Sequence, residues 1–267
     1  MRKSARRYNT VGMVNYFDSA RSAELYERGR PFYHDEALKA VAEAEGWTRP
    51  VANALDVGCG TGLSTRALLP YARRIIGLDA SPAMIARAPA DPRIRYRVAP
   101  AERLPLVSER IDLLTLSEAF HWLDQPRFLE EAHRVIRPGA WFLVYGGGIR
   151  GVMDEVPEFT PWMREVHLAR YPEPPRHPPF EPENGPPFGF EPVREGRYEK
   201  AVPMTAERLA DFFLSVSNTL QYLGDSGESP ETHRQFLVRE LLAFYGGRPD
   251  RIRHLRFGGR FHLLRRV

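Results

Sequence analysis

A glycine-rich turn offers the clearest residue types and spacing for chemistry in this sequence. Residues 55–62 read Leu-Asp-Val-Gly-Cys-Gly-Thr-Gly and follow an apolar run. Glycines allow a tight turn and let a ligand approach the backbone, because no Cβ stands in the way. The free amides at the start of a following helix favour an anion. The turn therefore predicts a site for an anionic ligand, in which Asp56 orients the loop and meets an ammonium group of the ligand.

The spacing of the glycines narrows the kind of ligand. Dinucleotide sites favour G-x-G-x-x-G, whereas this turn has G-x-G-x-G after an acid. A second acid, Asp79, ends the next strand-like run about 20 residues later, a separation at which a carboxylate can accept hydrogen bonds from ribose hydroxyls. Either feature alone also fits a turn or a strand end that binds nothing. The pair at this spacing favours a ligand that contains a ribose.

Apolar runs alternate with helical patterns between residues 50 and 150. This alternation indicates a parallel sheet with right-handed crossovers and helices on both faces. Ligands of such sheets lie beyond the carboxyl ends of the strands, where the glycine turn and both acids fall. The expected strands are 51–57, 74–79, 94–99, 111–116 and 140–145, and the expected helices are 62–69, 82–88 and 125–136.

The flanking segments have a different character. Residues 8–46 show helix-like spacing of apolar side chains, and residues 151–192 are crowded with prolines, which predicts mostly loop. We therefore divide the chain into an N-terminal helical cap (1–48), a Rossmann-like cofactor-binding core (49–150) and a proline-rich loop and helical insertion that also carries the last two strands (151–267). In that last part the expected strands are 194–201 and 255–266, and the expected helices are 205–223 and 230–245.

Four motifs resemble those of the class I S-adenosylmethionine-dependent methyltransferases (methyltransferase type 11-like), and within them the small-molecule branch that includes trans-aconitate methyltransferase. The two most specific are the glycine turn and the segment Gly-Leu-Asp-Ala-Ser-Pro-Ala-Met at 77–84. The others are Ala-Glu-Arg-Leu-Pro at 101–105 and Arg-Val-Ile-Arg-Pro-Gly at 134–139. The resemblance implies a doubly wound, Rossmann-like α/β fold with a seven-stranded, mostly parallel sheet, an antiparallel last strand and a helical cap.

The resemblance also implies where S-adenosylmethionine binds. The glycines of the turn would line its methionine end, Asp79 would hold the ribose, Met84 would pack on the adenine, and Ala101 and Glu102 would lie at the adenine edge. One departure is Pro100, because many relatives carry there an Asp that bonds the adenine amino group, and proline has no such side chain. The complete set of residues expected to bind the cofactor is Asp56, Gly58, Cys59, Gly60, Gly62, Asp79, Ala80, Met84, Ala101, Glu102, Ser117, Arg30 and Tyr16.

The methyl acceptor is expected near the end of the fourth strand, where residues 116–122 read Leu-Ser-Glu-Ala-Phe-His-Trp. His121 is the candidate catalytic residue, as a general base or as a hydrogen-bond partner of the acceptor, and it fits a packing role equally well. Trp122 is expected to pack rather than to form a wall of the acceptor site. Arg30 offers a planar fork to a carboxylate of the cofactor or the acceptor, and it also fits an exposed arginine before a proline turn. Residues that can either line an acceptor pocket or belong to the core are Trp162, His167, Tyr171, Phe212, Phe213, Asn218 and Tyr222.

The predicted function is methylation of a small molecule, with a carboxylic acid as one candidate acceptor. The sulfonium is already activated for an in-line displacement, so the protein chiefly positions the acceptor. A general base helps only where the acceptor loses a proton. A catalytically silent S-adenosylmethionine-binding module and an RNA or protein methyltransferase remain the alternatives. The lack of an Asn/Asp-Pro-Pro-Tyr/Phe signature counts against a DNA base as the acceptor.

The composition bounds the remaining classes. The net charge of +4 comes from scattered basic residues, so no nucleic-acid partner is expected. No run of about 18 apolar residues predicts a membrane span, and the histidines show no metal-ligand spacing, so no metal is expected. The single cysteine, Cys59, cannot form an internal disulfide, and no apolar stretch follows the basic N-terminus, which together predict a cytoplasmic protein. The oligomeric state is left open.

Overall fold

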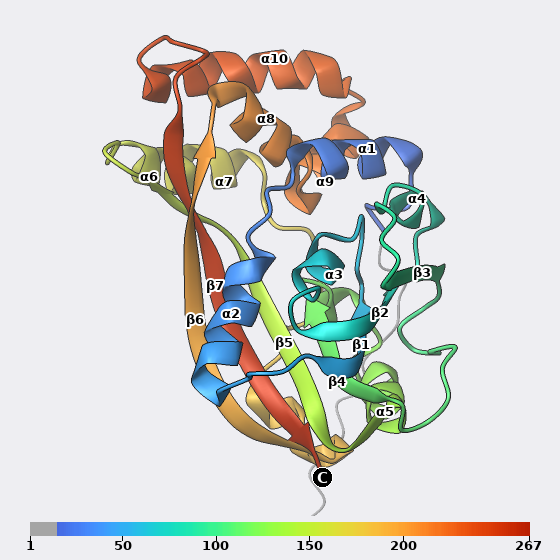
Figure 1. Ribbon diagram of the computed structural model, residues 1–267. Helices are drawn as coiled ribbons and strands as arrows, with labels where there is room; N and C mark the ends of the chain where they lie inside the picture. The colour runs from blue at the N-terminus through green and yellow to red at the C-terminus, as the bar shows by residue number, and fades with distance from the viewer. Residues whose placement is uncertain (1–14) are drawn as a thin grey trace, which may run out of the picture.

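The computed structural model describes residues 15–267, and one seven-stranded sheet runs through it. The strand order is β3-β2-β1-β4-β5-β7-β6, and every neighbouring pair is parallel except the two that β7 makes with β5 and β6. The predicted Rossmann-like sheet with an antiparallel last strand is therefore confirmed (Figure 1). The strands are β1 (Val51–Val57), β2 (Ala72–Asp79), β3 (Ile94–Val98), β4 (Ile111–Ser117), β5 (Ile136–Met153), β6 (Phe190–Met204) and β7 (Arg253–Arg266).

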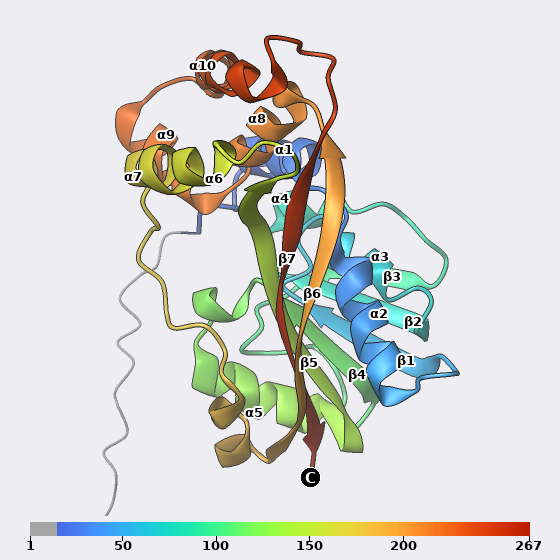
Figure 2. The ribbon, with the colours of Figure 1, turned by 90° about the vertical axis from the view of Figure 1, so that its left-hand side faces the viewer.

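Helices cover both faces of this sheet (Figure 2). α2 (His34–Glu45) and α3 (Leu63–Ala67) lie on one face, and α5 (Gln125–Val135) lies on the other. A hydrophobic cluster fills the space on each side. β4 lies between the two layers and all of its residues are buried, which explains the apolar side chains at four of its seven positions.

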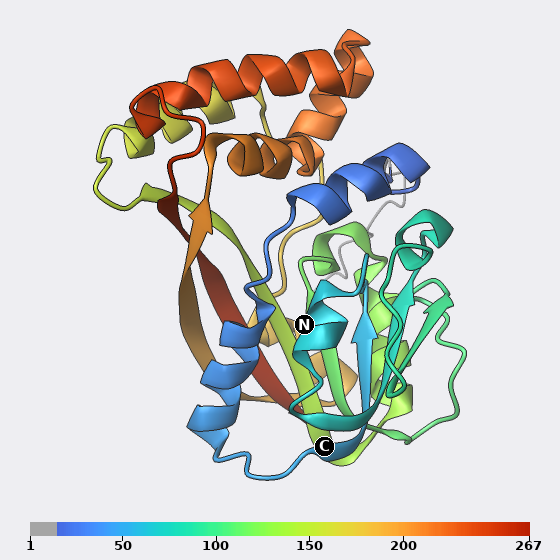
Figure 3. The same cartoon turned by 45° about the horizontal axis from the view of Figure 1, so that its top comes forward.

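The strands β5, β6 and β7 are longer than the others and extend past the carboxyl ends of β1 and β4 to a group of helices (Figures 1 and 3). α1 and α10 both pack on α8 in this helical layer. The two helices of the N-terminal segment therefore take different places, since α1 joins the helical layer and α2 covers the sheet. The helical layer consists of α1 (Ala20–Gly29), α6 (Phe159–Trp162), α7 (Leu168–Arg170), α8 (Ala206–Leu214), α9 (Ser217–Ser226) and α10 (Pro230–Leu241).

The largest difference from the sequence-based elements is the length of β5. The apolar pattern predicts a strand that ends at residue 145, but the ladder with β7 continues through Gly146, Gly147 and Gly148 and reaches Met153. Glycines contribute no apolar side chain to a pattern, so a strand that runs through three of them shows no periodicity. The long β5 is what carries the sheet up to the helical layer.

Several helices also differ from expectation. The helix expected at 205–223 is broken between α8 and α9, where Val216 is extended and the Ser215 hydroxyl donates to the carbonyl of Phe212 at 2.6 Å. α4 (Pro82–Ile85) is shorter than the expected helix 82–88. Residues 8–14 of the expected N-terminal helical segment lie outside the described residues. Within residues 15–267, no helix is long and apolar enough to cross a membrane.

Candidate functional site

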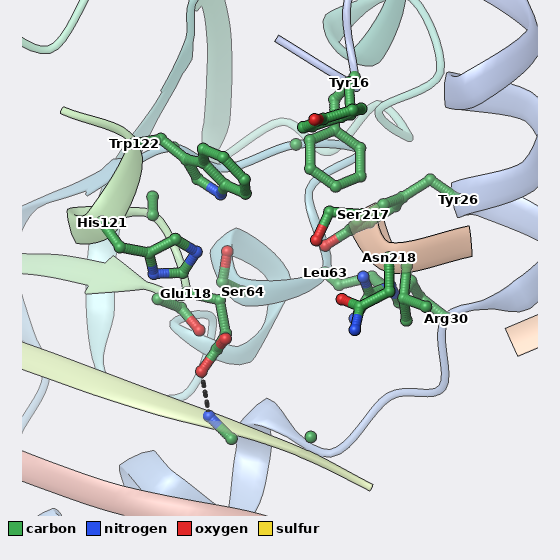
Figure 4. A pocket seen from close by; sticks show the side chains of 18 of the residues that line it. Tyr16, Tyr26, Arg30, Leu63, Ser64, Glu118, His121, Trp122, Ser217 and Asn218 are labelled. Atoms are coloured by element: carbon green, nitrogen blue, oxygen red, sulfur yellow. Dashed lines mark hydrogen bonds between the residues drawn. The ribbon is translucent and has the colours of Figure 1, made fainter. Parts of the chain in front are cut away.

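A cavity of about 700 Å³ lies where the carboxyl ends of the parallel strands meet the helical layer. Its lining comes from the glycine turn, from the loops after β2 and β4, from the glycine run of β5 and from the helical layer. Figure 4 shows side chains of these segments pointing toward one another from different elements. The cavity therefore gathers most of the predicted site residues, and their individual positions can be compared with expectation.

Residues 58–60 of the glycine turn line the cavity. Gly58, Gly60 and Gly62 have φ values of +68°, +53° and +84°, which L side chains rarely adopt. Gly58, Cys59 and Gly60 line the cavity, whereas Gly62 does not. A Cβ on Gly62 would lie 2.4 Å from the Tyr96 hydroxyl oxygen. Gly62 therefore allows close packing against Tyr96 behind the turn, and its predicted contact with the cofactor stays a prediction.

Asp56 also takes a different place from the one expected. It is fully buried behind the turn and does not line the cavity. Its carboxylate accepts hydrogen bonds from the hydroxyls of Ser64 (2.6 Å), Thr65 (2.7 Å) and Thr115 (2.8 Å). Burial raises the pKa of this carboxyl to about 6 despite these three donors. These hydrogen bonds tie the turn to the start of α3 and to β4, which fits a loop-orienting role for Asp56. The contact with an ammonium group of the ligand stays a prediction.

Asp79 connects the turn to the cavity. Its Oδ2 accepts a hydrogen bond from the Gly60 N–H at 2.8 Å, and its Oδ1 accepts one from the Ser81 N–H at 2.9 Å. Burial raises the pKa of this carboxyl. Each carboxylate oxygen has two lone pairs, so Asp79 can accept further hydrogen bonds on the side that faces the cavity. The position fits the predicted contact with ribose hydroxyls.

The remaining residues expected at the adenine end lie together. Ala80, Met84, Ala101 and Glu102 all line the cavity. Oε1 of Glu102 accepts a hydrogen bond from the Asp124 N–H at 2.9 Å, which ties this edge to the start of α5. Small, apolar and acidic residues therefore line this part of the cavity together, a combination that suits a heteroaromatic base.

Aromatic rings cover the cavity from the N-terminal side (Figure 4). The ring centroid of Tyr16 lies 6.0 Å from that of Trp122, edge to face. Phe17 makes similar contacts with Tyr26 at 5.8 Å and with Trp122 at 6.5 Å. All four residues line the cavity. Trp122 therefore both packs against other rings and forms a wall, two roles that the sequence presented as alternatives.

Arg30 follows α1 and points into the cavity between aromatic rings. Its guanidinium lies 4.9 Å from the ring centroid of Tyr26 and 5.4 Å from that of Phe212. Nη2 donates to the carbonyl of Ser215 at 3.1 Å, while the buried Nε has no hydrogen-bond partner among the described residues. Guanidinium donors that the protein leaves unused can bind a carboxylate. This geometry favours the ligand-binding interpretation of Arg30 over an exposed surface arginine.

Ser117 reaches the cavity from the last position of β4, and His121 reaches it from the segment after β4. The Nε2 atom of His121 lies 3.5 Å from Nη1 of Arg176. Burial, together with the charge of Arg176, lowers the pKa of His121 to about 4. The hydroxyl oxygen of Ser117 lies 3.4 Å from Nδ1 of His34. His121 is therefore an uncharged imidazole at neutral pH, which makes it a weak proton acceptor.

Glu118 is the residue that the sequence interpretation missed. It directly follows β4 with a φ of +54°, and its N–H donates to the carbonyl of Tyr145 at 3.2 Å. Its side chain lines the cavity, and Oε1 accepts a hydrogen bond from the Gly147 N–H (Figure 4). The surrounding protein raises the pKa of its carboxyl although the side chain is open to the cavity. The available signal was an acid directly after one strand and a glycine run at the end of the neighbouring strand.

Of the residues that could belong either to an acceptor pocket or to the core, four line the cavity and three lie behind it. His167, Phe212, Phe213 and Asn218 line the cavity, and Trp162, Tyr171 and Tyr222 do not. The rings of His167 and Phe213 are in contact, with centroids 3.9 Å apart. Within residues 15–267, no group of three His, Cys, Asp or Glu side chains is placed to hold a metal ion.

The fold and the cavity together define a class of protein. A sheet of this order, with a glycine turn after β1, an acid at the end of β2 and a cavity over both, has the architecture that the four motifs implied. It is the architecture of a Rossmann-like methyltransferase.

Comparisons with known proteins agree with this class. A family model described as "Methyltransferase domain" matches residues 55–144. An uncharacterized methyltransferase of Mycobacterium tuberculosis is 32% identical over 224 residues, which are 82% of each chain. A malonyl-[acyl-carrier protein] O-methyltransferase of Dechloromonas aromatica is 38% identical over 128 residues, which are 45% of this chain and 48% of that protein. A solved structure from Anaeromyxobacter dehalogenans, described as a type II methyltransferase, matches with a TM-score of 0.66 and 27% sequence identity. The match covers 89% of this chain and 97% of that chain.

The chain therefore belongs to the class I S-adenosylmethionine-dependent methyltransferases, and S-adenosylmethionine is its cofactor. The chain spans about half the length of several other curated relatives that it matches. None of the relatives named above is a trans-aconitate methyltransferase, so that narrower resemblance stays a prediction.

Proposed function

We propose that this methyltransferase transfers the methyl group of S-adenosylmethionine to a small molecule that occupies the same cavity. The observation that carries the proposal is the continuity of the cavity from the glycine turn to the helical layer. Its volume of about 700 Å³ lies within the range of about 300–1,000 Å³ that is usual for small-molecule sites. A cavity of this size, lined by protein on several sides, suits two small ligands better than a nucleic-acid or protein chain.

The proposed cofactor position uses the part of the cavity that we call the cofactor end (57–60, 79–84 and 99–102). The methionine carboxylate would lie near the free donors of Arg30 and the start of α3, the ribose hydroxyls at Asp79, and the adenine on Met84. This placement directs the sulfonium methyl toward the residues after β4. We call the region beyond it the acceptor end (117–122, 146–151, 160–176 and 212–218).

The chemistry asked of the protein is mostly positioning. The acceptor's lone pair attacks the methyl carbon while the carbon–sulfur bond breaks, and the neutral thioether leaves. Aromatic rings of Tyr16, Phe17 and Trp122 exclude water over the reacting atoms. An uncharged His121 can accept or donate a hydrogen bond to the acceptor, which is the role we propose for it.

A carboxylic acid is the acceptor molecule that we favour. Arg150, Arg164 and Arg176 line the acceptor end. Arg164 and Arg176 have ion-pair partners in Glu165 and Glu173, whereas Arg150 has none among residues 15–267. Arginines bind carboxylates with paired hydrogen bonds, so an acid could be held by these groups. The name of the Dechloromonas relative also gives an acid as the acceptor, a malonyl group that is attached to an acyl-carrier protein.

The test is a cofactor-consumption assay with metabolite fractions and with defined panels of carboxylic acids, amines and phenols. We expect S-adenosylhomocysteine to form with at least one small molecule, and product mass spectrometry should show a mass increase of one methylene group. Cofactor binding without turnover in any fraction would instead favour a catalytically silent binding module. Turnover that depends on added RNA or protein would contradict the small-molecule proposal. A cytoplasmic location stays a prediction beside it.

A further inference from the structure

The carboxylate of Glu118 is held at one point of the cavity by three separate features. The residue has a φ of +54°, a conformation that costs a non-glycine residue on the order of 1–3 kcal/mol. Its Oε1 accepts the Gly147 N–H. A Cβ on Gly146 would lie 2.5 Å from the same oxygen and touches nothing else nearer than 3.6 Å, so the carboxylate occupies the space that this glycine leaves. Backbone strain of this kind is concentrated at functional sites.

The surroundings of Glu118 leave it capacity for a ligand. Its second oxygen, Oε2, makes no hydrogen bond within residues 15–267, and no ion pair to the carboxylate exists in that part of the chain. The side chain is exposed to the cavity. The charged and titratable groups that interact with it from the packed elements are Arg30, Arg176, Glu173, Tyr26, Tyr33 and Tyr198.

We propose that Glu118 accepts the proton of the methyl acceptor, so that the reacting atom is a nitrogen or oxygen that carries hydrogen. This inference rests on the function proposed above and names the reacting group of that substrate. An acid substrate would then place its carboxylate at the arginines of the acceptor end and present an amine or hydroxyl to Glu118. A carboxylate as the reacting group is disfavoured, because two carboxylates at hydrogen-bond distance repel each other.

The step balances without a further reactant. The lone pair of the acceptor nitrogen or oxygen forms the bond to the methyl carbon, and the carbon–sulfur bond breaks with its electrons going to sulfur. The acceptor's proton moves to a carboxylate oxygen of Glu118. The sulfonium charge and the carboxylate charge disappear together, leaving S-adenosylhomocysteine, a methylated product and a neutral Glu118.

The pKa values of Glu118 and of its neighbour His121 are shifted in opposite directions. Burial lowers the pKa of His121 to about 4, whereas the surroundings of Glu118 raise the pKa of its carboxyl above the usual value. A base works best when its pKa approaches the working pH. The raised pKa of Glu118 therefore favours its role as a base, whereas the lowered pKa of His121 disfavours that role.

The test uses a cofactor analogue and needs no known acceptor. Sinefungin carries an amine-bearing carbon where S-adenosylmethionine has its methylated sulfur, so its ammonium marks the point of transfer. We expect the wild-type protein to bind sinefungin at least about tenfold more tightly than S-adenosylhomocysteine in calorimetry, because a charge-assisted hydrogen bond forms with Glu118. In Glu118→Gln this preference should disappear while the affinity for S-adenosylhomocysteine stays unchanged.

Three further variants separate position from charge. Gly146→Ala retains the carboxylate but displaces it, so it should lose the preference as well. Gly224→Ala is the matched control, since Gly224 does not line the cavity and a Cβ there meets nothing within 4 Å, and it should retain the preference. Glu207→Gln removes a carboxylate outside the cavity, which is paired with Arg234, and should also retain it.

Two results would overturn the inference. Equal weakening of both ligands in Glu118→Gln would assign the carboxylate to the cofactor's amino-acid end, and equal affinities in the wild type would place no carboxylate at the point of transfer. These outcomes are independent of the acceptor screen. A protein that methylates no small molecule but prefers sinefungin loses only the proposed function, whereas one that methylates a small molecule without this preference loses only the role of Glu118.

Discussion

The cofactor end and the acceptor end of the cavity are built in different ways. The cofactor end comes from three neighbouring strand ends, and its central contacts are made by backbone groups, such as the Gly60 N–H that donates to Asp79. The acceptor end is made by side chains from β4, β5 and the helical layer, which are far apart in the sequence. A site fixed by backbone changes little when surface side chains change. A site made of side chains on loops and short helices can change its ligand by substitution while the fold is kept.

The largest expected effect is at the backbone-built end. Gly60→Val places a branched side chain at a φ of +53°, on the side where a Cβ would already lie 3.7 Å from the Tyr26 ring. Strain on the order of 1–3 kcal/mol and filling of the cavity should together lower the affinity for S-adenosylhomocysteine by more than about 100-fold. Isothermal titration calorimetry checks this.

Gly139→Val is the control for that change. Gly139 has a φ of +76° near the start of β5, where a Cβ meets nothing within 4 Å. It should lose stability through the same strain and keep its cofactor affinity. If both variants bind S-adenosylhomocysteine equally well, the glycine turn is not the cofactor site.

The second prediction asks whether the cofactor end depends on a buried carboxyl that touches no ligand. The pKa of Asp56 is about 6 in the folded protein, whereas its ordinary value, which applies to the unfolded chain, is 3.8. A raised pKa means that the stability contribution is full below pH 3.8 and is lost as pH rises through about 6. A shift of this size corresponds to about 3 kcal/mol. The unfolding free energy of the wild type, relative to that of Asp56→Asn, should fall by about that amount across this window.

Urea unfolding at a series of pH values measures this difference. Saturating S-adenosylhomocysteine should raise both proteins' stability equally, because Asp56 lies behind the turn. A relative stability that does not vary with pH would mean that the Asp56 carboxyl has an ordinary pKa, and that its hydroxyl partners fully offset the cost of burial.

The same contrast explains what the sequence could predict. The parallel strands and the residues around Gly60 and Asp79 follow from local patterns, because each motif lies at the end of its own strand. The antiparallel last strand was implied by the family resemblance. The packing role of Gly62 could not be predicted, because its neighbour behind the turn is Tyr96, on a different strand, and sequence spacing does not reveal that contact. Glu118 was missed for the same reason, since its position depends on Gly146, which lies on another strand.

Arg30 lies where the two ends meet, and a third prediction assigns it to one of them. Arg30→Met keeps the apolar stem between Tyr26 and Phe212 but removes the guanidinium. If Arg30 holds the cofactor carboxylate, affinity for S-adenosylhomocysteine should fall by about 10-fold to 100-fold, as expected for a hydrogen bond to a charged group. Methylthioadenosine, which lacks the amino-acid part, should bind unchanged.

Arg28→Met is the matched control, because Arg28 lies on the same segment, is paired with Asp211 at 3.0 Å and does not line the cavity. Its affinity for both ligands should equal that of the wild type. Unchanged binding of S-adenosylhomocysteine by Arg30→Met would assign Arg30 to the acceptor end. Arg30 would then join the three arginines proposed to bind an acid there.

The smallest expected effect is at the acceptor end. His121→Ala removes one hydrogen-bonding group and should lower kcat by about fivefold to tenfold, as the loss of an uncharged hydrogen bond predicts, with cofactor affinity retained. The test uses the metabolite fraction that supports turnover.

Because the pKa of His121 is lowered to about 4, the imidazole is uncharged above that pH. The ratio of wild-type to variant kcat should therefore stay constant from about pH 6 to about pH 9. A ratio that changes near pH 6.5 would show that the charged imidazole takes part, and equal activity of the two proteins would leave His121 with packing alone.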